Sequence, residues 1–103
     1  MKLPNKVKVG GIYYTITDKP FEIDPKGTGA WGLTDHRSCI IYIDTGVSLN
    51  QVKDTLLHEI LHAIFFIYNV DTGDGEERVV TPTASGLVQV FEDNKPIRDF
   101  LLK

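Results

Sequence analysis

The stretch that decides the fold is residues 48–69, with the sequence SLNQVKDTLLHEILHAIFFIYN. It contains no glycine and no proline, and at about 100° per residue its apolar side chains cover most of the helix circumference, which predicts a buried helix. We expect Ser48 to cap this helix, with Gln51 completing a capping box. The remaining polar stripe carries two histidines and a glutamate, and burying them without partners would cost roughly several kcal/mol. A metal ion and its water would satisfy all three.

The polar stripe contains the motif His58-Glu59-Ile60-Leu61-His62. On a helix, two histidines four positions apart share one face, with Cβ atoms about 5–6 Å apart, so both can bind one Zn²⁺ at about 2.0–2.1 Å. Glu59 lies about 100° further round, where it can take a proton from a water on the metal. The motif therefore predicts a zinc-dependent hydrolase with His58 and His62 as ligands and Glu59 as general base. Two ordinary histidines on a helix are the alternative.

A catalytic zinc site needs a third protein ligand. Acidic residues follow the helix at positions 71, 74, 76 and 77, around a glycine-bearing turn at 73–75 that could reverse the chain. A second helix would then bring a carboxylate back over the histidines. Its apolar face lies closest to Glu77, which we take as the third ligand, with Glu76 as the main alternative. An aspartate of this segment or His36 stays open as well.

The motif, the acidic pair and residues 84–94 (ASGLVQVFEDN) resemble the short zincin-type proteins carried by bacteriophages and prophages, which are similar to the ImmA/IrrE and SprT-like metallopeptidases. The resemblance covers roughly residues 38–94. It implies a minimal zincin-like fold and a zinc peptidase, with His58 and His62 as ligands and Glu59 as general base. Pro82 departs from the pattern, because proline interrupts a helix interior. Thr81 could instead cap a helix that starts at Pro82, with the acidic pair in a preceding turn.

The first 47 residues are expected to form strands and loops. Residues 6–10 and 11–18 alternate apolar and polar side chains around Gly10-Gly11, which predicts a tight hairpin or one bulged strand. Residues 21–31 are rich in proline and glycine and predict a loop. Residues 38–44 form the clearest strand, either a wall that pairs with an extended peptide or a plain core strand. At the other end of the chain, we expect residues 94–96 to end the second helical segment and residues 97–103 to form a short tail or a final turn.

The predicted fold is therefore α+β. A single zincin-like domain over residues 1–103 would pack a small antiparallel or mixed sheet on the active-site helix, 48–69, and add a second helical segment, 76–93. Net charge −3 without a basic cluster argues against nucleic-acid binding, and no apolar run is long enough to span a membrane. A single cysteine, Cys39, and the absence of a signal-peptide core favour the cytoplasm.

The expected function is hydrolysis of a protein or peptide by a zinc-activated water. The alternative is a non-catalytic zincin-like module that acts through protein contact, with or without structural zinc; a structural protein without metal is a third possibility. His36 reads as a surface loop histidine, with substrate binding or transition-state stabilisation as the alternative role. Tyr42 and Tyr68 could donate to an oxyanion, although core packing is the simpler expectation for both.

Overall fold

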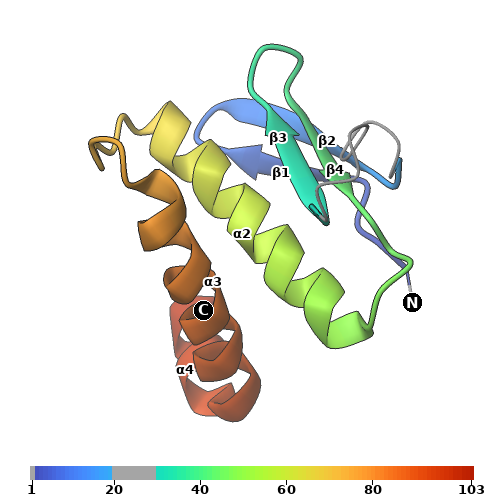
Figure 1. Cartoon of the computed structure of the whole chain (residues 1–103). Helices are drawn as coiled ribbons and strands as arrows, with labels where there is room; N and C mark the ends of the chain where they lie inside the picture. The colour runs from blue at the N-terminus through green and yellow to red at the C-terminus, as the bar shows by residue number, and fades with distance from the viewer. Residues whose placement is uncertain (1, 20–29) are drawn as a thin grey trace.

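The computed structural model describes residues 2–19 and 30–103, and Figure 1 shows how their helices and strands are arranged. The chain runs through β1 (Lys6–Val9), β2 (Ile12–Thr17), β3 (Gly32–Asp35), β4 (Ile40–Ile43), α2 (Leu49–Ile67), α3 (Glu76–Asp93) and α4 (Lys95–Leu101). The described residues thus form an α+β structure with a four-stranded mixed sheet and three helices. Most of the loop expected at 21–31 lies outside the described residues.

The sheet has the strand order β1-β2-β4-β3. β1 and β2 are antiparallel and joined by the two glycines, with Val9 opposite Ile12, so the hairpin is the correct one of the two alternatives. Gly10 has φ +60°, a left-handed conformation that a two-residue hairpin turn requires and glycine adopts without strain. β2 and β4 are parallel, and β3 and β4 are antiparallel.

The strand expected at 38–44 is shorter than predicted and lies inside the sheet. β4 pairs with β2 on one side and with β3 on the other, so both its edges are occupied. Of the two alternatives for this strand, pairing with an extended peptide is therefore wrong, and the core strand is correct, with Ile41 and Ile43 fully buried. Among the described residues β3 pairs only with β4, which leaves β3 as the strand at the sheet edge next to α2.

Helix α2 crosses one face of the sheet (Figure 1). Ser48 caps it, because its hydroxyl oxygen accepts the backbone N–H of Gln51 at 3.2 Å. The Gln51 side chain donates to Thr55 instead of returning to Ser48, so the capping box is only half formed. The helix ends at Ile67, two residues before the predicted end, and Asn69 adopts a left-handed φ of +53° beyond it. The core between sheet and helix consists of Val9, Tyr14, Ile16, Ile41, Ile43, Val52 and Ala63.

Helix α3 runs back along α2, and α4 folds against α3 (Figure 1). α3 is continuous from Glu76 to Asp93 with Pro82 inside it, so the helix does not begin at the proline. Pro82 cannot donate to the carbonyl of Arg78, but both residues are exposed, so water can reach the freed carbonyl. The segment after residue 96, expected to be a short tail or a final turn, belongs instead to the short helix α4. No helix among the described residues is long and apolar enough to cross a membrane.

Candidate metal centre

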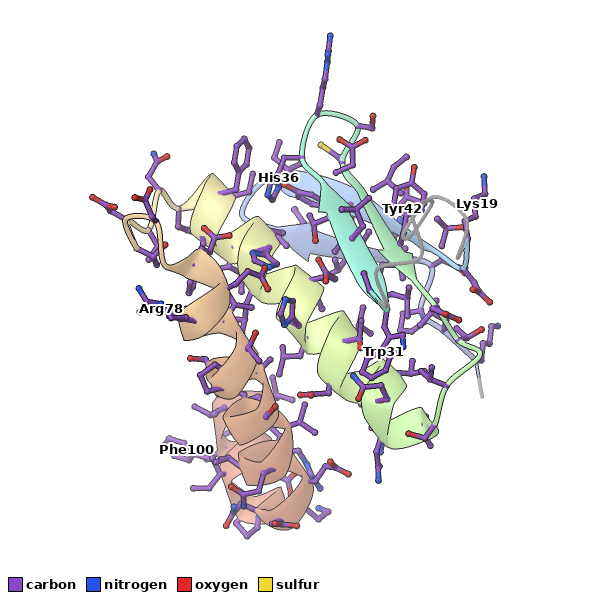
Figure 2. The ribbon with its side chains drawn as sticks, in the orientation of Figure 1. Lys19, Trp31, His36, Tyr42, Arg78 and Phe100 are labelled. Carbon is purple, nitrogen blue, oxygen red and sulfur yellow. The ribbon has the colours of Figure 1, made fainter. Side chains whose placement is uncertain are left out.

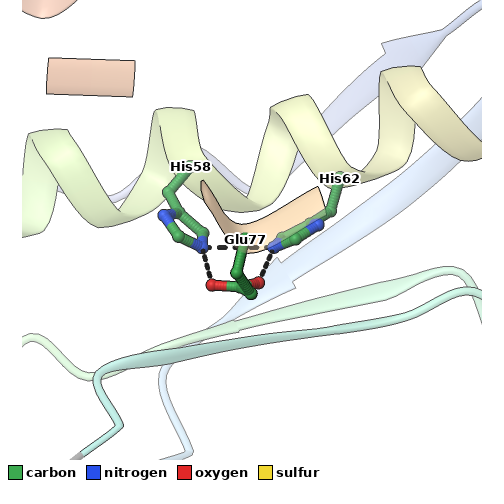
Figure 3. Close-up of side chains that lie close together, drawn as sticks. All are labelled: His58, His62 and Glu77. Carbon is green, nitrogen blue, oxygen red and sulfur yellow. Dashed lines mark hydrogen bonds and ion pairs between the residues drawn. The ribbon is translucent and has the colours of Figure 1, made fainter. Parts of the chain in front are cut away.

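Three side chains from two helices converge at one point (Figure 3). His58 and His62 lie one turn apart on α2, and their Nε2 atoms are 3.1 Å from each other. Glu77, in the first turn of α3, places Oε2 at 3.3 Å from His58 Nε2 and Oε1 at 2.5 Å from His62 Nε2. Each of the three residues offers one ligand atom, and these three atoms lie within 4.8 Å of one another. The structure thus brings together the two histidines and the glutamate that were predicted from the sequence as ligands.

The reversal of the chain between α2 and α3 carries Glu77 to this point. Gly73 has φ +61° in the connecting turn, where the Asp71 carboxylate accepts its backbone N–H at 2.8 Å. Beyond the turn, α3 packs on α2 through a small apolar cluster of three buried residues, Leu61, Val80 and Ala84. This packing fixes the rotation of α3, so the first-turn carboxylates face the histidines.

Glu76, the alternative third ligand, has a different place. Its Oε2 lies 2.5 Å from His62 Nδ1, on the side of the ring facing away from His58. A carboxylate accepts hydrogen bonds, so in the neutral imidazole the proton sits on Nδ1 and Nε2 keeps its lone pair toward Glu77 and His58. Glu76 therefore orients one histidine, and neither an aspartate nor His36 belongs to the donor group found among the described residues.

Glu59 is the buried acid next to the donor group. It is only 6% exposed, and its Oε2 is 4.0 Å from His58 Nε2. The Thr34 hydroxyl on β3 lies 2.7 Å from Glu59 Oε1 and 3.1 Å from the Glu59 backbone carbonyl oxygen. Its hydrogen is therefore donated to Glu59. Burial raises the pKa of the Glu59 carboxyl above its ordinary value, although the Thr34 hydrogen bond opposes this. A higher pKa makes the carboxylate a stronger base.

Strand β3 approaches Glu59 closely because residue 32 is glycine. A Cβ atom at Gly32 would lie 2.7 Å from Thr55 Cγ2, 2.9 Å from Glu59 Oε2 and 3.0 Å from Glu59 Cγ. Real Cβ atoms essentially never come closer than 3.0 Å to another heavy atom. Gly32 and Thr34 could not be recognised as parts of the site from the sequence, because no local pattern links them to their partners on α2, which lie more than twenty positions away.

These groups line one pocket of about 540 Å³ between β3 and α2. Trp31, Leu33 and Thr34 form the sheet side, while the histidines and Glu59 form the helix side, with Glu77 at the rim. The side chain of Glu77 is 70% exposed, so the donor group opens toward solvent. Tyr42 and Tyr68 do not line this pocket.

His36 also lines the pocket and is partly buried, which corrects its interpretation as a surface histidine (Figure 2). The hydroxyl of Tyr14 lies 3.2 Å from His36 Nδ1, and the ring stacks on Phe66 with centroids 4.2 Å apart and planes 6° from parallel. Burial lowers the pKa of His36, as does the nearby His62, against the opposing effect of Glu76 and Asp35. The imidazole is therefore neutral at pH 7.

Comparisons with known proteins returned no match: no protein family, no curated protein and no solved structure matches this chain. A functional proposal for this chain therefore rests on its sequence motif and on the geometry of the site.

Proposed function

We propose that this chain is a zinc-dependent metallopeptidase built on a minimal zincin-like fold. The single observation that supports it most is the convergence of His58, His62 and Glu77 beside the buried Glu59, at the wall of one pocket. Two imidazoles and a carboxylate, with a fourth position left for water, are one of the recurrent ligand sets of catalytic zinc.

The donor set fits zinc in its spacing and its proton positions. Two donors bound at about 2.0–2.1 Å to a tetrahedral zinc stand roughly 3.3–3.4 Å apart. The distances from His58 Nε2 to His62 Nε2, 3.1 Å, and to Glu77 Oε2, 3.3 Å, are close to this spacing. The distance from His62 Nε2 to Glu77 Oε1 is only 2.5 Å, so these two atoms would have to move apart by about 0.8 Å for both to bind a tetrahedral zinc. Glu76 adds the carboxylate partner that metal-binding histidines usually have on the second ring nitrogen. The exposed rim at Glu77 leaves room for water and substrate.

Bound zinc would polarise a carbonyl group and lower the pKa of a water molecule toward about 7. Glu59 would take the proton of the attacking water and deliver it to the leaving amine nitrogen. Thr34 holds one carboxylate oxygen at 2.7 Å, which leaves Oε2 on the side of His58. Because Gly32 has no Cβ, the carboxylate can take this position close to β3.

We further propose that the substrate is an extended peptide segment bound along β3. This strand lies at the sheet edge and lines the pocket through Leu33 and Thr34. Its outward N–H and C=O groups could pair with a peptide backbone as an added strand, which would carry a scissile bond past Glu59.

The first test is metal content and hydrolysis by protein purified without a histidine tag. We expect about one zinc per chain in the wild type, loss of zinc in His62→Ala, and retained zinc in Glu59→Gln. We also expect zinc-dependent cleavage of fluorescently labelled casein by the wild type and none by Glu59→Gln. Zinc without Glu59-dependent cleavage would favour the non-catalytic binding module, and no zinc after reconstitution would overturn the metal centre itself.

A further inference from the structure

We infer that His36 is a further catalytic residue, which donates its Nε2–H to the carbonyl oxygen of the scissile peptide bond, and that Tyr14 is the positioning residue that sets its tautomer. This inference rests on the proposed peptidase function and adds a hydrogen-bond donor that the zinc motif does not contain. Five contacts of His36 and of the turn that carries it support the inference.

The first contact is the hydrogen bond between Tyr14 and His36. Tyr14 is fully buried at 0% exposure, and His36 Nδ1 is the hydrogen-bond partner of its hydroxyl among the described residues. Burial raises the pKa of the Tyr14 phenol, so it keeps its proton. A buried hydroxyl hydrogen without an acceptor is costly, so Tyr14 donates and Nδ1 accepts. In the neutral imidazole the remaining proton is then on Nε2.

The second contact is the stacking of His36 on Phe66. The two rings are 6° from parallel at 4.2 Å, so the imidazole plane is held flat against the last part of α2. The two nitrogens of an imidazole ring point in roughly opposite directions, so with Nδ1 directed to the buried Tyr14 we infer that Nε2 faces away from the core. Since His36 lines the pocket, this edge is the one available to a bound substrate.

The remaining contacts fix the backbone that carries His36. The Asp35 carboxylate accepts the N–H groups of Arg37 and Ser38, at 3.0 and 3.2 Å, and the Cys39 thiol donates to the His36 carbonyl at 3.6 Å. These bonds lock the turn between β3 and β4. Such preorganisation is what a group needs in order to stabilise charge that develops on a reacting oxygen.

A neutral histidine suits this role for a chemical reason. A tetrahedral intermediate places negative charge on the former carbonyl oxygen, and a fixed N–H donor stabilises that charge more than it stabilises the substrate. Removing one such donor typically lowers kcat by about 10²–10³-fold. Thr34 cannot serve instead, because its hydroxyl hydrogen is already committed to Glu59.

The tautomer can be tested without any activity measurement. Long-range ¹H–¹⁵N correlation spectra of the metal-free protein at pH 7 report which ring nitrogen of each histidine is protonated, and His36→Leu identifies the His36 signals. We expect protonated Nε2 and bare Nδ1 in the wild type, and a shift toward the other tautomer in Tyr14→Phe. Protonated Nδ1 in the wild type, or an unchanged tautomer in Tyr14→Phe, would overturn the assignment of Tyr14 and His36.

The substrate contact is tested in the casein assay with two His36 variants. His36→Leu keeps an apolar group against Phe66 without a donor, whereas His36→Gln offers an amide N–H near the position of Nε2. We expect kcat to fall about 10²–10³-fold in His36→Leu and less in His36→Gln, with zinc content and melting temperature unchanged. Wild-type kcat in His36→Leu would overturn the inference. If the wild type itself cleaves nothing, the peptidase proposal fails and the substrate contact fails with it, whereas the tautomer result stands separately.

Discussion

Replacing Gly32 by alanine tests the close approach of β3 to α2. The added Cβ would lie 2.7 Å from Thr55 Cγ2, about 0.7 Å inside the 3.4 Å at which ordinary contact begins. Thr55 is only 7% exposed and its hydroxyl accepts a hydrogen bond from Gln51, so this side chain can move little. Glu59 Oε2, at 2.9 Å, is the far end of a longer side chain and can move more easily. We therefore expect the carboxylate to be displaced.

Overpacking of this kind costs about 1–3 kcal/mol of unfolding free energy. In a domain of this size each kcal/mol lowers the melting temperature by about 4–8 °C. The variant should still bind zinc, because His58, His62 and Glu77 are not displaced, and its casein cleavage should fall sharply. Urea unfolding of the metal-free protein followed by circular dichroism measures the first effect, and elemental analysis with the cleavage assay measures the others.

The matched control is Gly86→Ala. Gly86 lies exposed on α3, its Cβ would meet nothing within 4 Å, and alanine has the higher helix propensity, so we expect a gain of about 0.5–1 kcal/mol. If the free energy of unfolding of Gly32→Ala is within about 0.5 kcal/mol of the wild-type value and the cleavage rate is unchanged, the close approach of β3 to Glu59 does not depend on glycine at position 32.

Three further outcomes follow from contacts of α2. Because burial raises the native pKa of Glu59, its ionisation lowers stability once the pH exceeds the unfolded-state value of about 4.3. Metal-free Glu59→Gln should therefore be about 0.5–2 kcal/mol more stable at pH 7, and urea titrations should show this gain disappearing below about pH 4. Glu76→Gln should weaken zinc affinity about 10–100-fold, because it removes the carboxylate charge that contacts His62 Nδ1. Competition with a chelator measures this affinity, and an unchanged affinity would contradict the orienting role. Ser48→Ala should cost about 1 kcal/mol in thermal unfolding through the lost cap on Gln51, and no loss would show the cap to be replaced by water.

The helical half of the site could be predicted from the sequence because its geometry is local. The spacing of His58 and His62 depends only on the helix repeat, and the acidic pair follows within one reversal of the chain. The apolar face of the second helix favours Glu77 over Glu76, and Glu77 is the residue that lies with the two histidines, but the contact of Glu76 with His62 Nδ1 could not be predicted in this way. This contact depends on the rotation of α3, which the packing of Val80 and Ala84 on α2 determines.

The sheet half of the site could not be predicted from the sequence, because its contacts join residues that are far apart along the chain. Tyr14 and His36 are 22 positions apart, and alternation predicts that Tyr14 is buried without indicating its partner. The order of the strands is equally hidden, since an apolar run such as Ile40–Ile43 fits an edge as well as an interior position. For this reason the sequence leaves open whether the strand at 38–44 pairs with a peptide or lies in the core, and the peptide-binding role belongs instead to a proposal about β3.

The division of the site between a helical hairpin and a sheet has a consequence for how the protein reaches its active form. The three proposed zinc ligands lie within twenty consecutive residues, His58–Glu77, so the loop that joins them closes at low entropic cost, and we expect their contacts to form early. The groups that hold Glu59 arrive only with β3, whose partner strands must first assemble through the parallel pairing of β2 and β4. We therefore expect zinc to be captured by chains whose sheet is still incomplete, and to act as a template for the rest of the fold. Under the proposed function, metal loading would precede competence for catalysis, and the zinc-bound chain would become a hydrolase only at the last step of folding.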